Sequence, residues 1–358
     1  MRSPSRLEIA ALWILSAWIF AFTVFHFRSI HPNLRDFGDN PAYLDAARAI
    51  HNWNFANVIV KQFWGLSYAI ALFSFLPHIS LYTALLLICM TCSLLSVLLA
   101  YQLWGAWVAG YFAVLNFDWM QRSYLGGSEP LFVALLFASF VCVRKERWLW
   151  AAILAALASL VRPLGLFALL AIGLVLLYRR EYRKFLMCTA AGAILGALYL
   201  LPFWLYFHDP LYQFHRYQTA DWHSGPAVGL PFQALASSFL HNTEPLTNVL
   251  LTLGWVVFIQ AGFIAMMRKS FRPFMSQHPT EFLFAFLYLA FLLSYNSGWA
   301  RAEFPRFAIP LVPLVLIALE PWVPKSRVIL YAACIVGALL AACSALGVRN
   351  VLAALHSH

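Results

Sequence analysis

The sequence predicts an all-helical protein that crosses a membrane many times, with about eleven transmembrane helices, give or take two. Of the 358 residues, 63% are hydrophobic and only 11% are charged, and the mean hydropathy is +0.75. A water-soluble chain of this length would need a far more polar surface. The excess of apolar side chains must therefore face lipid.

The first apolar run, residues 9–27, is about long enough to cross a bilayer as a helix. Further apolar runs follow at 80–101, 104–117, 128–143, 148–161, 164–178, 185–206, 248–267, 281–296, 307–320 and 328–347. Runs of about 14 apolar residues fit either a short helix buried in the bundle or a full span, which is why the expected count carries a margin.

Basic residues gather in five clusters that predict the orientation of the chain. They are MRSPSR at the start, RKER at 144–147, RREYRK at 179–184, RKSFR at 268–272, and Lys325 with Arg327. If the N-terminus is cytoplasmic and the spans alternate, all five clusters fall on the cytoplasmic side, as the positive-inside rule expects. The same clusters suit contact with anionic membrane lipids. No nucleic-acid partner is expected, because no compact basic fold carries them.

This orientation places two long polar loops, residues 28–79 and 207–247, together on the non-cytoplasmic face of one integral membrane domain, 1–358. We therefore expect the active-site face there, with helical segments in the loops. The sequence has no Walker loop, no Rossmann glycine pattern and no zinc-protease histidine pair. Their absence disfavours ATP-driven pumping and metalloproteolysis.

The first loop contains NLRDFGDNPAYLDAARAI, in which Asp36 and Asp39 stand three residues apart just after the first span. A helix-like run follows, with Pro41 suited to its first turn. Asp39 or Asn40 can cap that helix by accepting backbone N–H bonds at its positive end. A carboxylate held there is equally well placed for chemistry, so both interpretations stay open.

Two later positions pose the same choice. Glu129, in YLGGSEPLFVALLFAS, stands at the mouth of an apolar helix, where it or Ser128 either caps the helix or serves the site. Arg162, in LVRPLGL, lies between two apolar runs, where it either extends to the membrane interface or serves the site.

The last apolar runs are preceded by Arg301, Glu303 and Arg306 in RAEFPRFAIPLVPLVLIAL. These residues form either a salt-bridged surface turn or part of a site. The second long loop carries His208, Asp209, His215, Asp221 and His223, whose spacing matches no standard metal-ligand pattern. We predict no metal site and no cofactor, and interpret these residues as ordinary loop polarity, although a divalent metal there is the alternative.

In order and topology these motifs resemble the GT-C superfamily of polytopic glycosyltransferases. The chain is most similar to its bacterial mannosyltransferase-like members, which use a polyprenyl-phosphate sugar. The resemblance implies that Asp39 is the acid of the catalytic loop, with Asp36 as its second acid. It matches the family's later acid to Glu129, and its arginine-proline and arginine-aromatic elements to Arg162 and Arg306. Many relatives carry adjacent acids in the loop, whereas two residues separate them here.

The resemblance implies transfer of a mannose-like hexose from a lipid-linked donor to a glycan, lipid or protein acceptor, with inversion, in a bacterial plasma membrane. One carboxylate, Asp39, takes the proton of the acceptor hydroxyl. The leaving phosphate is a weak base, so cations suffice to stabilise it. The candidates are Arg301 and Arg306, followed by Arg122, Arg162, Lys61 and His208.

Two other classes of protein also fit a chain of many spans. A transporter or lipid flippase typically shows internal repeats with broken helices near the membrane midplane. No repeat is evident here, and the charged groups gather at one face. A purely structural membrane subunit would have little use for Asp36, Asp39 and Glu129 in this arrangement.

Overall fold

The computed structural model describes residues 3–27, 34–55, 58, 62–218, 228–240, 246–295 and 303–347. These residues are helical apart from loops and one isolated antiparallel bridge between Val228 and Tyr295, which confirms the all-helical prediction. The chain divides into two compact units, Met1–Phe137 with Pro321–His358, and Ala138–Glu320. Each unit is described by itself.

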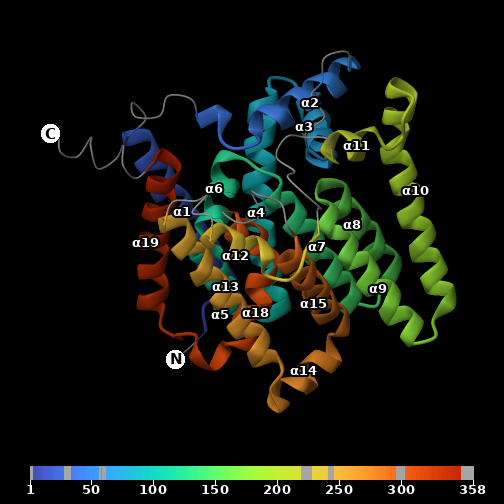
Figure 1. The fold of residues 1–358 in the computed structure, drawn as a ribbon. Helices are drawn as coiled ribbons and strands as arrows, with labels where there is room; N and C mark the ends of the chain where they lie inside the picture. Colours follow the sequence, from blue (N-terminus) through green and yellow to red (C-terminus); the bar gives the residue numbers. More distant parts are fainter. Residues whose placement is uncertain are drawn as a thin grey trace. The chain divides into compact units, whose positions relative to one another are not determined.

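The first unit is a helical bundle. Its elements are α1 (Arg6–His26), η1 (Leu34–Asp36), α2 (Asn40–Asn52), α3 (Gly65–Ser74), α4 (Leu81–Trp104), α5 (Ala106–Leu115), α6 (Phe117–Leu125), the start of α7 (Glu129–Arg144), and α19 (Arg327–Leu346). Helix α1 lies along α19, and α5 and α6 pack against both (Figure 1). Helices α2 and α3 pack on each other and on α4.

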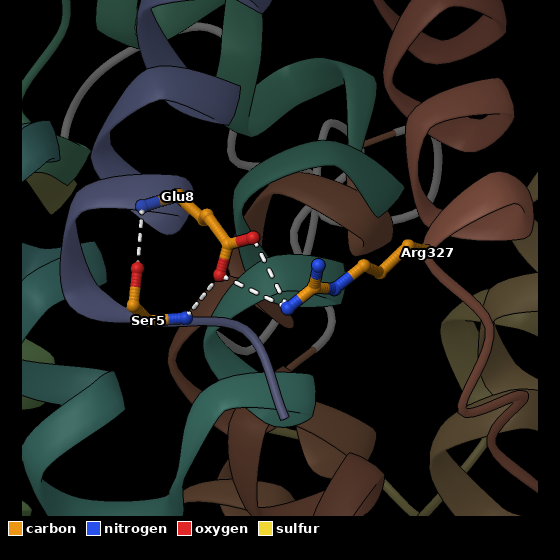
Figure 2. A network of polar contacts seen from close by, with 3 residues as sticks. All are labelled: Ser5, Glu8 and Arg327. Atoms are coloured by element: carbon orange, nitrogen blue, oxygen red, sulfur yellow. Dashed lines mark hydrogen bonds and ion pairs between the residues drawn. The ribbon is translucent and has the colours of Figure 1, made fainter. Parts of the chain in front are cut away.

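Polar contacts at the start of α1 show how this bundle is oriented. Ser5 and Glu8 form a capping box, and the Glu8 carboxylate also lies 3.1 Å from the guanidinium of Arg327, the first residue of α19 (Figure 2). Helices α1 and α19 therefore begin at the same end and run parallel. The Arg6 guanidinium lies over the ring of Tyr101, so α4 ends where α1 begins.

The second unit holds the remaining helices. They are α8 (Trp148–Val161), η2 (Pro163–Gly165), α9 (Leu166–Tyr178), α10 (Tyr182–Phe207), α11 (Tyr212–Gln218), α12 (Gln233–Leu240), α13 (Leu246–Met266), η3 (Lys269–Phe271), α14 (Arg272–Gln277), α15 (Pro279–Ser294), α17 (Phe304–Phe307), η4 (Ile309–Leu311) and α18 (Val312–Ala318), with η5 (Glu320–Trp322) at the boundary. Helix α10 packs on α8 and α9, α15 on α9, and α13 on α18.

Fewer full-length spans form than the eleven expected. Among the described residues five helices are long and apolar enough to cross a membrane, or six if the bent pair α6 and α7 is one span. The runs expected at 104–117, 148–161, 164–178 and 281–296 form shorter apolar helices. The run at 307–320 divides into η4 and α18, because Pro310 and Pro313 cannot donate backbone hydrogen bonds inside a helix. The chain remains an integral multi-pass membrane protein.

A buried ion pair joins α7 to α15 in the second unit. The Arg144 guanidinium donates two hydrogen bonds to the Glu281 carboxylate, at 2.6 and 2.9 Å, and Glu281 is only 1% exposed. Burial, reinforced by the nearby Arg144 charge, lowers the pKa of His278 just before α15, and Glu281 opposes this shift. Arg144 therefore has a structural partner in addition to its place in a basic cluster.

Three basic clusters lie at this same end of the second unit. Arg179 stacks over Trp148, which follows the cluster at 144–147. Phe271, from the cluster at 268–272, contacts Phe282 of α15. Phe282 directly follows Glu281, which binds Arg144. Helix α8 begins here and ends next to Arg162, so Arg162 lies at the opposite end of the unit.

We expect Arg144→Ala to lower the free energy of unfolding by about 2 kcal/mol, because the buried Glu281 carboxylate loses both charge-assisted hydrogen bonds and stays desolvated. Thermal unfolding in detergent measures the change. Lys145→Ala, at an exposed neighbouring position, is the matched control and should have almost no effect. Equal stability of the two variants would show that the ion pair contributes nothing.

Candidate functional site

The site in the first unit is built on the elbow between α6 and α7. Asn116 begins α6 by accepting the backbone N–H of Trp119 at 2.9 Å. Gly126, with a φ of +111° that L side chains rarely adopt, ends it. Helix α7 starts at Glu129 at an angle of 107° to α6. Most of the segment 116–129 is therefore a helix whose side chains are largely buried.

The start of α2 docks on this elbow through Asn40. This residue is completely buried, and its Nδ2 donates to the backbone oxygen of Leu125 at 2.8 Å. Its amide group also packs on Gly126, where an added Cβ would lie 2.8 Å from Oδ1. Asp39 occupies the N-cap position of α2, yet its side chain makes no capping hydrogen bond there. Capping therefore does not account for Asp39, although Pro41 takes the first turn as predicted.

Arg122 of α6 lies beneath the loop that carries Asp39. Its guanidinium stands 4.7 Å from the ring centroid of Phe37, and the guanidinium packs so closely on Gly38 that an added Cβ would collide with it. Gly38 has a φ of +57°. The buried arginine is thus covered by the two residues that separate Asp36 from Asp39.

Glu129 joins the same cluster through Gly127. A Cβ at Gly127 would lie 2.6 Å from Cδ of Arg122 and 2.7 Å from Oε2 of Glu129, so both side chains contact this glycine. Both are nearly inaccessible to solvent. Burying a charged group costs free energy unless the charge is compensated. The elbow therefore carries the cost of burying two charged side chains close together.

Gly127→Ala is expected to lower any activity that depends on this cluster sharply, because the methyl group would displace both Arg122 and Glu129. Gly196, within α10, resembles Gly127 in having no positive φ, but it has nothing within 4 Å of an added Cβ. Gly196→Ala is therefore the control for a glycine-to-alanine change without a steric collision. Measuring turnover together with thermal unfolding separates a loss of activity from a loss of stability. Equal turnover of both variants would show that displacing Arg122 and Glu129 does not affect activity.

The structure brings the Asp39 loop, Arg122 and Glu129 together in the first unit. Asp39 is partly exposed, whereas Asp36, at the end of η1, is exposed. Leu85, near the start of α4, contacts Gly126, so the cluster lies toward the end of the bundle away from Arg6 and Glu8.

A second group of candidates lies in the second unit. Arg162 follows α8 in an extended conformation, as a residue before proline prefers, and its guanidinium stands 4.8 Å from the ring centroid of Phe307. Arg306 donates to Glu303 at 2.8 Å, which agrees with the expected salt bridge, but Arg306 is buried in place of lying on a surface turn. Arg162 is buried as well and does not extend to water.

The remaining described candidates are not brought to either cluster. His208 is exposed at the end of α10 in a left-handed conformation. Asp209 accepts from Nδ1 of His215 at 2.8 Å, an ordinary local contact, and no group of three metal-ligating residues occurs among the described residues. Lys61 and Arg301 lie outside the described residues, as do Asp221 and His223.

Sequence reasoning missed the packing that assembles the site. Asn40 appeared only as one of two candidate caps, because nothing local indicates that its side chain reaches Leu125, 85 positions away. The paired glycines at 126 and 127 were the available signal, since adjacent glycines before a helix often mark a turn or a close approach.

A known protein family matches more than half of the sequence. The sequence model of glycosyltransferase family 87 matches residues 65–295. This range contains Arg122, Glu129 and Arg162, and it does not reach Asp39 or Arg306. No curated protein matches the chain.

Proposed function

Because the chain belongs to glycosyltransferase family 87, a family of polytopic membrane glycosyltransferases of the GT-C type, we propose that it moves a mannose-like hexose from a polyprenyl-phosphate donor to an acceptor hydroxyl. Family membership makes the protein a membrane glycosyltransferase with a sugar donor and an acceptor. It also sets aside a transporter or a structural subunit. The donor, the sugar and the mechanism are the proposal.

The observation that carries the mechanism is the docking of the α2 start on the α6–α7 elbow. It holds the loop of Asp39 over Arg122, beside Gly127, which Arg122 and Glu129 both contact. In the proposed reaction the Asp39 carboxylate accepts the acceptor's hydroxyl proton while that oxygen displaces the donor phosphate from the anomeric carbon. The bond to the new oxygen forms on the opposite face, so the configuration inverts. Glu129 and Asp36 are proposed to contact the sugar or the acceptor.

The departing polyprenyl phosphate requires positive charge and no general acid. Arg306 is buried two residues after Phe304, which lines a small, mostly apolar pocket with residues of α12, α13 and α15. Arg306 and Arg162 are the proposed phosphate contacts in the described part of the chain, with Arg301 from outside it.

The proposal of a lipid donor rests on which side of the membrane the reaction takes place. In each unit the basic groups share one end, as shown by the Glu8–Arg327 and Arg144–Glu281 contacts. Within each unit, the candidate residues that the structure describes lie toward the other end. This arrangement supports a cytoplasmic N-terminus in a bacterial plasma membrane, with the site on the far face. Nucleotide sugars stay in the cytoplasm, so the sugar would arrive on lipid.

The direct test uses purified protein in detergent with polyprenyl-phosphate mannose and polyprenyl-phosphate glucose as donors. Release of polyprenyl phosphate in the presence of an acceptor, absent with a nucleotide sugar, is the expected result. Transfer from the nucleotide sugar alone would overturn the lipid-donor proposal and leave the family assignment intact.

Orientation has its own test, in which a cysteine placed at Ser224 is expected to react with a membrane-impermeant thiol reagent added to intact cells. The unaltered chain gives the background from the six native cysteines. A cysteine placed at Lys145, in a basic cluster, should be labelled only after permeabilisation. The reverse pattern would place the long loops in the cytoplasm and remove the argument for a lipid donor.

A further inference from the structure

We propose that Asn40 is a positioning residue that aligns Asp39 with Arg122 and Glu129 by capping α6 from another part of the chain. This inference rests on the proposed function, because the group it positions is the proposed base. Asn40 itself contacts neither donor nor acceptor in this account.

The contact that Asn40 makes is unusual in its location. Leu125 is the last residue of α6, and its carbonyl is one of those that a helix end leaves without an intrahelical partner. The Nδ2 of Asn40 donates to this carbonyl across 85 positions of sequence. The bond therefore fixes the end of α6 to the first residue of α2.

Each charged group of the cluster is at most four residues along the chain from one partner of this bond. Asp39 is covalently adjacent to Asn40, Arg122 is three residues before Leu125, and Glu129 starts α7 directly after the elbow. A change in the Asn40 bond would therefore shift the acid relative to the other two groups. Misplacing a reacting group by about 1 Å can lower a rate by about a hundredfold.

Stability alone does not explain an amide at this position. Asn40 is completely buried, and within the described residues its Oδ1 has no hydrogen-bond partner. A buried acceptor without a partner costs free energy that an apolar residue of similar size would avoid. The amide is accounted for by the directed bond that it gives to Leu125, since packing alone would favour an apolar side chain.

The chain provides a matched control at the other end of the same helix. Asn116 is also a buried asparagine, and it caps the start of α6 through its bond to the N–H of Trp119. Asn116→Ala and Asn40→Ala each remove one capping hydrogen bond from α6. Both should lower thermal stability, but only Asn40→Ala acts on the residue next to Asp39.

The test is a double-mutant cycle measured as transfer from polyprenyl-phosphate sugar by the full-length protein in detergent. We expect Asn40→Ala to reduce kcat by about 10- to 100-fold with little change in KM for the donor. In the Asp39→Asn background the same change should cost less than about twofold, because the base it positions is already lost. Asn116→Ala should leave kcat within about twofold of the native protein in both backgrounds.

The outcomes separate this inference from the proposed function. Native transfer by Asp39→Asn would remove the base assignment itself. A slow Asp39→Asn protein with a native kcat for Asn40→Ala, or losses that simply multiply, would overturn the positioning role alone. Asn40→Ser leaves a smaller cavity and cannot span the distance to Leu125, so it should reproduce the loss of kcat. If neither Asn40 variant folds while Asn116→Ala does, Asn40 is a folding residue and the inference is wrong.

Discussion

Asp39→Asn is expected to slow sugar transfer by about 10²- to 10⁴-fold, the usual contribution of a general base, while the protein stays folded in detergent. The amide keeps the size of the carboxylate and cannot accept the hydroxyl proton. Because the Asp39 side chain makes no capping hydrogen bond to α2, no helix cap is lost. Initial rates of polyprenyl phosphate release, compared with thermal unfolding, measure the two effects separately.

Asp36→Asn is the matched variant, since the same substitution falls three residues earlier in the same loop. Asp36 is exposed at the end of η1, whereas Asp39 lies next to Gly38, which covers Arg122. We therefore expect a smaller loss from Asp36→Asn. If the ranking were reversed, Asp36 would be the base. If both variants kept native rates, the acids of this loop would have no part in proton transfer.

The fold was predictable where the sequence pattern was long and uninterrupted. Helices α1, α4, α10 and α19 follow apolar runs of the right length, so hydropathy alone located them. Short runs were ambiguous because a buried helix inside a bundle and a full span have the same composition. Buried α6 was missed for another reason: Asp118, Gln121 and Arg122 give it the polarity of a loop, and only its neighbours reveal that it is enclosed.

The candidate residues were predictable by type, and their grouping was not. Charged residues in an apolar chain are costly, so Asp39, Glu129 and Arg162 stood out without any structure. The contacts that arrange them depend on residues that look ordinary in sequence. Phe37 covers Arg122, and Asn40 reaches Leu125 from a distant segment. Such tertiary contacts leave no periodic pattern, which is why sequence reasoning could not choose between capping and chemistry.

Arg306→Ala is expected to reduce turnover with the lipid donor by about 10- to 100-fold, because a charge-assisted contact to phosphate contributes about 1.5–3 kcal/mol. The arginine is buried in the second unit and bonded to Glu303, a carboxylate that remains partly exposed. A phosphate would have to share this guanidinium with Glu303. Arg presents five N–H donors, so one side chain can hold both partners.

Glu303 provides a test of whether Arg306 binds phosphate, because the direction of the change in KM for the donor separates the two interpretations. Glu303→Gln keeps the shape of the side chain and removes its negative charge, so the positive charge of Arg306 is less compensated. If Arg306 binds phosphate, Glu303→Gln should leave KM for the donor unchanged or lower it, while Arg306→Ala raises KM or lowers kcat. If the pair only stabilises the turn before η4, both variants should lose thermal stability and keep native kinetics. If Arg306→Ala lost stability without any kinetic change, Arg306 would not be a phosphate contact. The other proposed arginines would then remain as the candidates.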